Sequence, residues 1–129
     1  MTSVASPRVR TEHGMVEGLE VDGLHWFRNI PYAAPPFGSR RFLPPQPAED
    51  WDGVRDATEP GPVPPQPVEE NPLGAIYAAT EIGEDCLTLE VWTPDPGRAG
   101  LPVVVHIHGG RVHLRRRVAA RLQRQELRA

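Results

Sequence analysis

Residues 101–110 read LPVVVHIHGG. The first part is a near-continuous run of apolar, mostly β-branched residues, as in a strand that is buried on both faces of an α/β sheet. The closing pair, Gly109 and Gly110, ends the run and allows a close backbone approach. The stretch therefore predicts a strand over residues 101–107 that leads directly into a loop.

Two further strand regions lie upstream. Residues 9–31 contain two short apolar segments separated by Asp22-Gly23, a dipeptide that suits the positive φ angles of a hairpin turn. We therefore expect an antiparallel, hairpin-like pair of strands in this region. In residues 87–93 the sequence LTLEVWT alternates with a period of two, which indicates a strand that ends before Pro94.

The chain between these strand regions is rich in proline. Of the 16 prolines, 12 fall between Pro31 and Pro72. Proline fixes φ and lacks the N–H donor that a helix or a central strand needs. We therefore expect mostly coil over residues 35–72 and a short helix at about residues 73–79. The expected fold class is α/β, with leading strands, Pro-rich coil and an incomplete sheet.

The composition limits the function classes. A chain of 129 residues fits one domain, and its single cysteine, Cys86, excludes an intrachain disulfide and a multi-cysteine metal site. The first thirty residues hold no apolar run long enough for a signal peptide, and no later run could span a membrane. We therefore expect a cytoplasmic location and no membrane partner.

The charge changes sharply near Gly110. Residues 1–110 carry 16 acidic and 7 basic side chains (net −9), whereas residues 111–129 carry 7 Arg and one Glu (net +6). Such a switch marks a boundary. We expect a disordered start over residues 1–8, a domain portion over residues 9–110, and a separate Arg-rich segment over residues 111–129.

Three ordered motifs carry a family resemblance. They are IPYAAPPFGSRRFLPPQPAEDWDGVRDAT, then EDCLTLEVWTP, then LPVVVHIHGG. Together, over roughly residues 9–110, they resemble the N-terminal part of the type-B carboxylesterase family. The resemblance implies the N-terminal part of an α/β-hydrolase fold. It also implies a hydrolase that attacks a small-molecule carboxylic ester through a serine acyl-enzyme, with no cofactor and no metal.

The resemblance gives the loop after residue 107 a role. In the family, backbone N–H groups of this loop form the oxyanion hole, which stabilises the carbonyl oxygen as it gains negative charge. Gly110 matches one such donor, and Gly109 permits the tight approach. Arg111 stands where the family usually has Gly or Ala, so a bulky side chain follows the donor.

The resemblance also implies a structural ion pair. Glu84 of EDCL would pair with Arg41 of the RF motif and pin the Pro-rich coil to the strand. Two separately solvated charges are the alternative, because a buried ion pair stabilises only when both partners are desolvated and fixed in place. Cys86 would be a buried small apolar residue, since the position where many animal relatives have its disulfide partner holds Pro64.

The catalytic groups of the family cannot be assigned in this sequence. Acyl transfer needs a serine at a strand-to-helix elbow, a histidine base and an orienting acid. The serines are Ser3, Ser6 and Ser39, and none lies in G-x-S-x-G; none of the five histidines can be assigned as the base. His106 and His108 do not indicate zinc, because no third ligand is in view. No catalytic residue and no metal ligand is therefore predicted, and we expect this chain to be inactive alone.

The Arg-rich segment leaves two interpretations open. If Arg111 to Arg115 were encoded CGC GTT CAC CTC CGG, starting one base later would give Ala-Phe-Thr-Ser-Gly, as expected in the family. The segment would then be out of frame, and the chain would be a truncated ester hydrolase. Alternatively, a helix over residues 114–127 could present the arginines to a polyanion, which would make the chain a non-catalytic interaction module. The first interpretation is favoured, and nucleic acid is not an expected partner.

Overall fold

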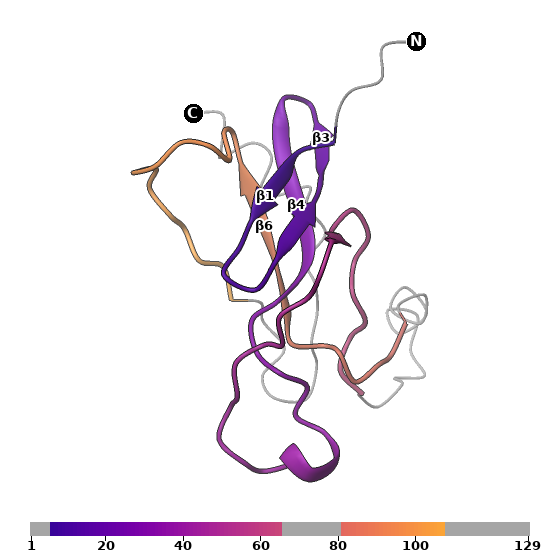
Figure 1. Ribbon diagram of the computed structural model, residues 1–129. Coiled ribbons are helices and arrows are strands. Elements are labelled where there is room, and N and C mark those ends of the chain that lie inside the picture. Colours follow the sequence, from indigo (N-terminus) through magenta and orange to yellow (C-terminus); the bar gives the residue numbers. More distant parts are fainter. Residues whose placement is uncertain (1–5, 66–80, 108–129) are drawn as a thin grey trace, which may run out of the picture.

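The computed structural model describes residues 6–65 and 81–107, and its regular elements are mainly strands (Figure 1). Six strands form two three-stranded sheets, which we call sheet A (order β1-β2-β5) and sheet B (order β3-β4-β6). No α-helix occurs among the described residues. The elements are β1 (Arg8–Arg10), β2 (Met15–Glu17), β3 (Leu19–Val21), β4 (Leu24–Pro31), a 3-10 turn η1 (Gly38–Arg40), β5 (Val54–Asp56) and β6 (Thr88–Thr93).

The predicted hairpin turn is confirmed. β3 and β4 pair antiparallel with Val21 opposite Leu24, and the two residues between them have positive φ, 54° at Asp22 and 76° at Gly23. Positive φ at both central positions matches the twist of a hairpin, and Asp tolerates it better than most side chains. The prediction of two strands in residues 9–31 was too simple, because four strands form there.

Gly18 explains the extra strands. It separates β2 from β3, so the chain passes here from sheet A to sheet B. A Cβ at this position would lie 2.5 Å from the carbonyl oxygen of Trp26 and 2.6 Å from the ring of Phe27. Only glycine lets the chain cross this close to β4.

The predicted strand over residues 87–93 is confirmed as β6. It pairs antiparallel with β4, and the pairing shifts register between Phe27 opposite Val91 and Ile30 opposite Leu89. The shift is a β-bulge in which Asn29 takes a φ of 54°. Asn is one of the few residues with a side chain that adopts this conformation readily.

A small core joins the two sheets. Val16 of β2, Phe27 of β4 and Ala57 just after β5 are buried against one another. The Ala57 backbone also bridges the sheets, because its N–H donates to Glu17 O (2.7 Å) and its carbonyl accepts from Arg28 N (2.8 Å). Three partly buried apolar side chains pack around this core, namely Val9, Ile30 and Trp51.

The Pro-rich region is mostly coil, as predicted, over the described residues 35–65. Its exceptions are η1 and β5, the latter a short parallel partner of β2. Trp51 holds this coil against sheet A through a hydrogen bond from its indole Nε1 to Met15 O (2.8 Å). The rest of the predicted coil and the predicted helix at about residues 73–79 lie outside the described residues.

The predicted strand over residues 101–107 is wrong for this structure. These residues form no regular element, and Figure 1 shows the orange segment after β6 running out to the side of both sheets. Val103, Val104, Val105 and Ile107 are 79–88% exposed. A strand of this composition needs neighbouring strands and cover on both faces, and none of the described residues provides either.

Candidate functional site

The predicted oxyanion loop begins just beyond the described chain. Gly109 and Gly110 lie outside the described residues, and the description ends at Ile107. His106, which precedes that end, is exposed to solvent. What the structure describes is therefore the framework that leads to the loop.

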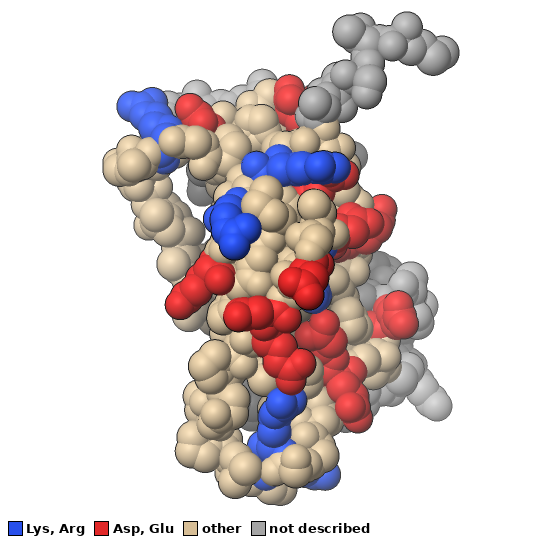
Figure 2. All heavy atoms as spheres, in the orientation of Figure 1, with Lys and Arg blue, Asp and Glu red and all other residues tan. Residues whose placement is uncertain are grey.

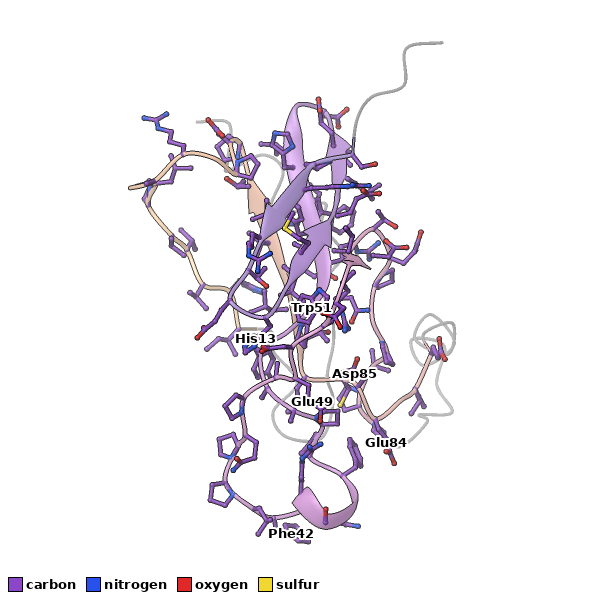
Figure 3. All side chains as sticks on the ribbon, viewed as in Figure 1. His13, Phe42, Glu49, Trp51, Glu84 and Asp85 are labelled. Atoms are coloured by element: carbon purple, nitrogen blue, oxygen red, sulfur yellow. The ribbon has the colours of Figure 1, made fainter. Side chains whose placement is uncertain are left out.

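The predicted partners Arg41 and Glu84 are not paired in the described part of the chain. The Arg41 guanidinium lies over the ring of the next residue, Phe42, with 5.0 Å between its carbon and the ring centroid. Glu84 is exposed, and Figure 3 places it well away from Phe42, which occupies the tip of the lower loop. Their pairing stays a prediction, and the geometry seen here matches the alternative of two solvated charges.

Arg55, and not Arg41, binds the segment that contains Glu84. Arg55 of β5 donates from Nε to Asn29 O (3.1 Å) and from Nη2 to Asp85 Oδ2 (3.2 Å). Its guanidinium also lies 5.6 Å from the Trp51 ring. One side chain thus joins β5, the bulge in β4 and the segment that enters β6. Gly61 leaves room for this junction, because a Cβ there would overlap the Asn29 side chain.

A second polar contact fixes the middle of the Pro-rich coil. His13 Nδ1 lies 2.8 Å from Asp50 Oδ1, and the Trp51 backbone N–H donates to His13 O (3.0 Å). Gly14 sits directly under Trp51, since a Cβ there would lie 2.5 Å from the indole Nε1. Figure 3 shows His13 and Trp51 close together beside the sheets. The turn before β2 is therefore matched to the coil that packs on it.

The Asp56 carboxyl group has a shifted pKa. The Thr58 hydroxyl donates to Asp56 Oδ1 (2.7 Å), and the Thr58 backbone N–H donates to the same oxygen (2.8 Å). The hydroxyl contributes most and the N–H next, and together they lower the pKa of Asp56. These bonds form a local turn at the end of β5, because both join residues two positions apart.

The described residues contain no assembled catalytic centre. Neither Ser6 nor Ser39 hydrogen-bonds a histidine in residues 6–65 and 81–107. Within those ranges no three His, Cys, Asp or Glu side chains gather as metal ligands do. Cys86 is buried, as predicted. None of the described helical turns is long and apolar enough to cross a membrane.

The family follows from comparison with known proteins. A family model described as the carboxylesterase family matches residues 5–126. The chain belongs to the carboxylesterase family. The matched range extends past Gly110 into the Arg-rich segment, so it does not itself mark the boundary predicted at that residue.

Individual carboxylesterase relatives agree. The phenmedipham hydrolase of Pseudarthrobacter oxydans is 43% identical over 109 residues, which is 83% of this chain and 22% of the relative. The para-nitrobenzyl esterase of Bacillus subtilis (strain 168) is 42% identical over 106 residues, again 22% of its length. This chain therefore spans about a fifth of the length of the curated relatives it matches.

Solved carboxylesterases share the described fold. A PNB esterase superposes with a TM-score of 0.73 at 44% identity, over 83% of this chain and 22% of that one. A carboxylesterase of Geobacillus stearothermophilus superposes with a TM-score of 0.54 over 67% of this chain and 16% of that one. The two-sheet structure is therefore the corresponding part of a known α/β-hydrolase domain, and the helices of that fold are not among the described residues.

Two of the contacts in this chain were not predicted from its sequence. Arg55 and Asp85 lie 30 positions apart, and nothing in their spacing indicates that they meet. The one indication of an ion pair in this region was the EDCL motif, in which Asp85 follows Glu84. His13 and Asp50 are 37 positions apart and offered no signal at all.

Proposed function

We propose that residues 9–110 supply the N-terminal part of a carboxylic-ester hydrolase, with Gly109 and Gly110 in its oxyanion loop. The observation that carries the proposal is the family membership combined with the superposition on PNB esterase. LPVVVHIHGG supports it further, because an apolar run followed by glycines is the local sequence that presents free backbone N–H groups. The substrate class is a small-molecule carboxylic ester.

In the complete enzyme the loop acts after a serine has attacked the ester carbonyl. The carbonyl oxygen becomes an oxyanion as the C–O double bond opens, and the Gly110 N–H donates to it. Each such donor lowers the barrier by roughly 2.7–4 kcal/mol when it is already in place. The histidine base of the complete enzyme takes the serine proton during attack and gives it to the departing oxygen, so collapse of the intermediate releases the alcohol. Water, activated by the same base, then releases the acid from the acyl-serine.

The same argument makes the present chain inactive alone. No serine of the sequence lies in G-x-S-x-G, so no nucleophile delivers an oxyanion to the loop. The residues that lead to the loop are also exposed, so they give it no rigid support. The backbone N–H donors of the loop speed ester hydrolysis only when they are held in place and a tetrahedral intermediate forms beside them.

We further propose that residues 111–129 are out of frame rather than a functional basic segment. The change from net −9 to net +6 at Gly110 supports this, as does the codon set that restores Ala-Phe-Thr-Ser-Gly. The nucleotide sequence after the Gly110 codon tests it. A continuous alternative frame that contains G-x-S-x-G is the expected result, and its absence would contradict the proposal.

A chimera tests the proposed function directly. Residues 6–110 of this chain replace the matching N-terminal segment of the Bacillus subtilis para-nitrobenzyl esterase. We expect this esterase chimera to hydrolyse p-nitrophenyl acetate, because both parts belong to one family and this chain is 42% identical to the esterase over 106 aligned residues. A soluble, folded chimera without hydrolysis would contradict the proposal.

A further inference from the structure

The loop that carries η1 contains the longest exposed run within the described residues 35–65. Every residue from Gly38 to Pro47 is exposed. The loop returns to the body of the protein where the Ala34 N–H donates to Gln46 O (3.0 Å). Figure 3 places Phe42 at the tip of this loop, and Figure 2 shows basic side chains among uncharged ones at the same lower end of the molecule. Another protein can therefore reach this segment from solvent.

The hydrogen bonds at the tip of the loop are local. Three backbone N–H groups donate to a carbonyl three positions earlier in the chain, over 3.1–3.2 Å: Arg40 to Phe37, Arg41 to Gly38 and Leu43 to Arg40. The Arg40 side chain adds an ion pair to Glu49 (3.0 Å), and both partners are exposed, so the pair is weak. Opening the tip breaks these local contacts and leaves the strand pairing of both sheets in place.

Phe42, which follows Arg41, has an unfavourable backbone conformation. Its φ is 63°, in the left-handed region that a bulky side chain adopts only at a cost. The Phe42 side chain is 92% exposed and that of Leu43 is 60% exposed, so burial does not offset this cost. An extended conformation of Phe42 would release the strain.

An enzyme that cleaves after arginine requires these features. Proteins bind short peptide segments in an extended form when main-chain hydrogen bonds hold them, and an acidic group at the base of the specificity pocket of trypsin selects a basic side chain. Arg40 and Arg41 offer two successive guanidinium groups, and the bond after Arg41 leads to Phe42 and not to a proline. Exposed loop tips are also the preferred sites of proteolytic nicking.

We propose that the Arg40–Arg41 pair is a processing site for an arginine-specific serine endoprotease. The protease serine attacks the Arg41 carbonyl carbon, the amide bond breaks, and the Phe42 nitrogen leaves with a proton. Water then adds its hydroxyl to the Arg41 acyl group and returns a proton to the serine. The site is independent of the proposed ester hydrolysis, because it uses none of the residues assigned to that reaction.

The cut chain remains one assembly. Strands β1 to β4 precede the cut, whereas β5 and β6 follow it. Across the cut, β6 pairs with β4, β5 pairs with β2, and Ala57 is buried against Val16 and Phe27. Arg55 also donates to Asn29 O across it (3.1 Å). Processing therefore produces two fragments that stay bound through both sheets.

Limited digestion of the folded full chain with trypsin tests the site, with the fragments identified by mass. We expect early fragments that end at Arg40 or Arg41. Arg28 and Arg55 lie in strands and should be cut at least about tenfold more slowly, because the sheets must open first. Arg98, which is exposed after β6, is the internal control for an accessible bond. Cleavage at Arg98 while Arg40 and Arg41 stay intact would overturn the proposal.

Glu84→Gln tests whether an ion pair protects Arg41. If Arg41 is solvated, as in this structure, the variant should be cut at the Arg40–Arg41 pair at the wild-type rate. Faster cutting of the variant would mean that Glu84 holds the loop closed, which would overturn the proposal. Circular dichroism checks that the variant is folded as the wild type is.

Two substitutions at Phe42 test the contribution of backbone strain. Asn adopts positive φ readily and Val does not, so Phe42→Asn should be cut more slowly than Phe42→Val. Each rate is divided by that of a peptide of residues 36–48 with the same substitution, which removes any preference of trypsin itself. Equal corrected rates would overturn the role of Phe42.

Gel filtration tests the assembly of the cut chain. The fragment that ends at Arg41 should elute together with the fragment that begins at Phe42, and the two should separate in urea. Cuts within residues 108–129 shorten only the second fragment and are assigned by mass. Separation of the two fragments without urea would overturn the inference that the cut chain stays assembled.

Discussion

Replacing Arg55 by methionine tests the contact that holds the entry to β6. Methionine keeps an unbranched apolar stem of similar length against Trp51 but removes the guanidinium. The lost bond to Asn29 O (3.1 Å) comes from a charged donor, and such bonds contribute roughly 1.5–3 kcal/mol. The ion pair to Asp85 adds less than about 1 kcal/mol, because the Asp85 side chain is 47% exposed. We therefore expect Arg55→Met to lower the free energy of unfolding by about 2 kcal/mol.

The assay is urea unfolding of the full chain, followed by tryptophan fluorescence at low protein concentration to suppress association. Asp85→Asn should cost less than about 1 kcal/mol, since it removes only the half-exposed charge. Arg41→Met is the control, because the Arg41 guanidinium lies over the exposed Phe42 ring, and it should change stability by less than about 0.5 kcal/mol. The reasoning is refuted if Asp85→Asn costs as much as Arg55→Met, or if Arg41→Met costs more than either.

Three further predictions concern the bulge, the turn after β5 and activity. Asn29→Gly should leave urea stability nearly unchanged while Asn29→Val lowers it by roughly 1–3 kcal/mol, because φ is 54° there; equal effects would contradict this. The lowered pKa of Asp56 means that its stabilising contribution is complete above the unfolded pKa of about 4 and is lost as pH falls through the lower folded value. Thr58→Val removes the hydroxyl that contributes most to the lowered Asp56 pKa, so the loss of stability at acid pH should become smaller. An unchanged dependence of stability on pH would contradict this prediction. The full chain alone should hydrolyse p-nitrophenyl acetate no faster than its Gly110→Pro variant, and turnover blocked by a serine reagent would show otherwise.

Local signals in the sequence predicted the local structure well. Asp22-Gly23 predicted the hairpin because this turn requires positive φ at two successive residues, and Asp and Gly both adopt it. The alternation over residues 87–93 predicted β6 because its side chains point to alternate faces, with Leu89 and Val91 opposite apolar residues of β4 on one face and Trp92 stacked on Trp26 on the other. The prolines predicted coil because each one lacks the backbone N–H that a helix or a central strand needs.

Contacts between distant residues could not be predicted in the same way. The Arg55–Asp85 and Arg41–Glu84 pairings are equally compatible with sequence, and only the packing of Trp51 and the bulge at Asn29 brings Arg55 to the segment before β6. The strand predicted over residues 101–107 was wrong for a different reason. Their composition describes a strand buried within a complete sheet, whereas the described residues supply no neighbour for it.

The central claim is that Gly110 contributes an oxyanion donor to an ester hydrolase, and the esterase chimera measures it most directly. Replacing Gly110 by proline removes the N–H, and replacing it by alanine keeps it. We expect kcat for p-nitrophenyl acetate to fall by about 10²–10³ in the proline chimera, as on loss of one oxyanion-hole donor. The alanine chimera should stay within about tenfold of the parent, since its donor remains. Both variants should match the parent in circular dichroism. Full activity in a folded proline chimera would contradict the claim.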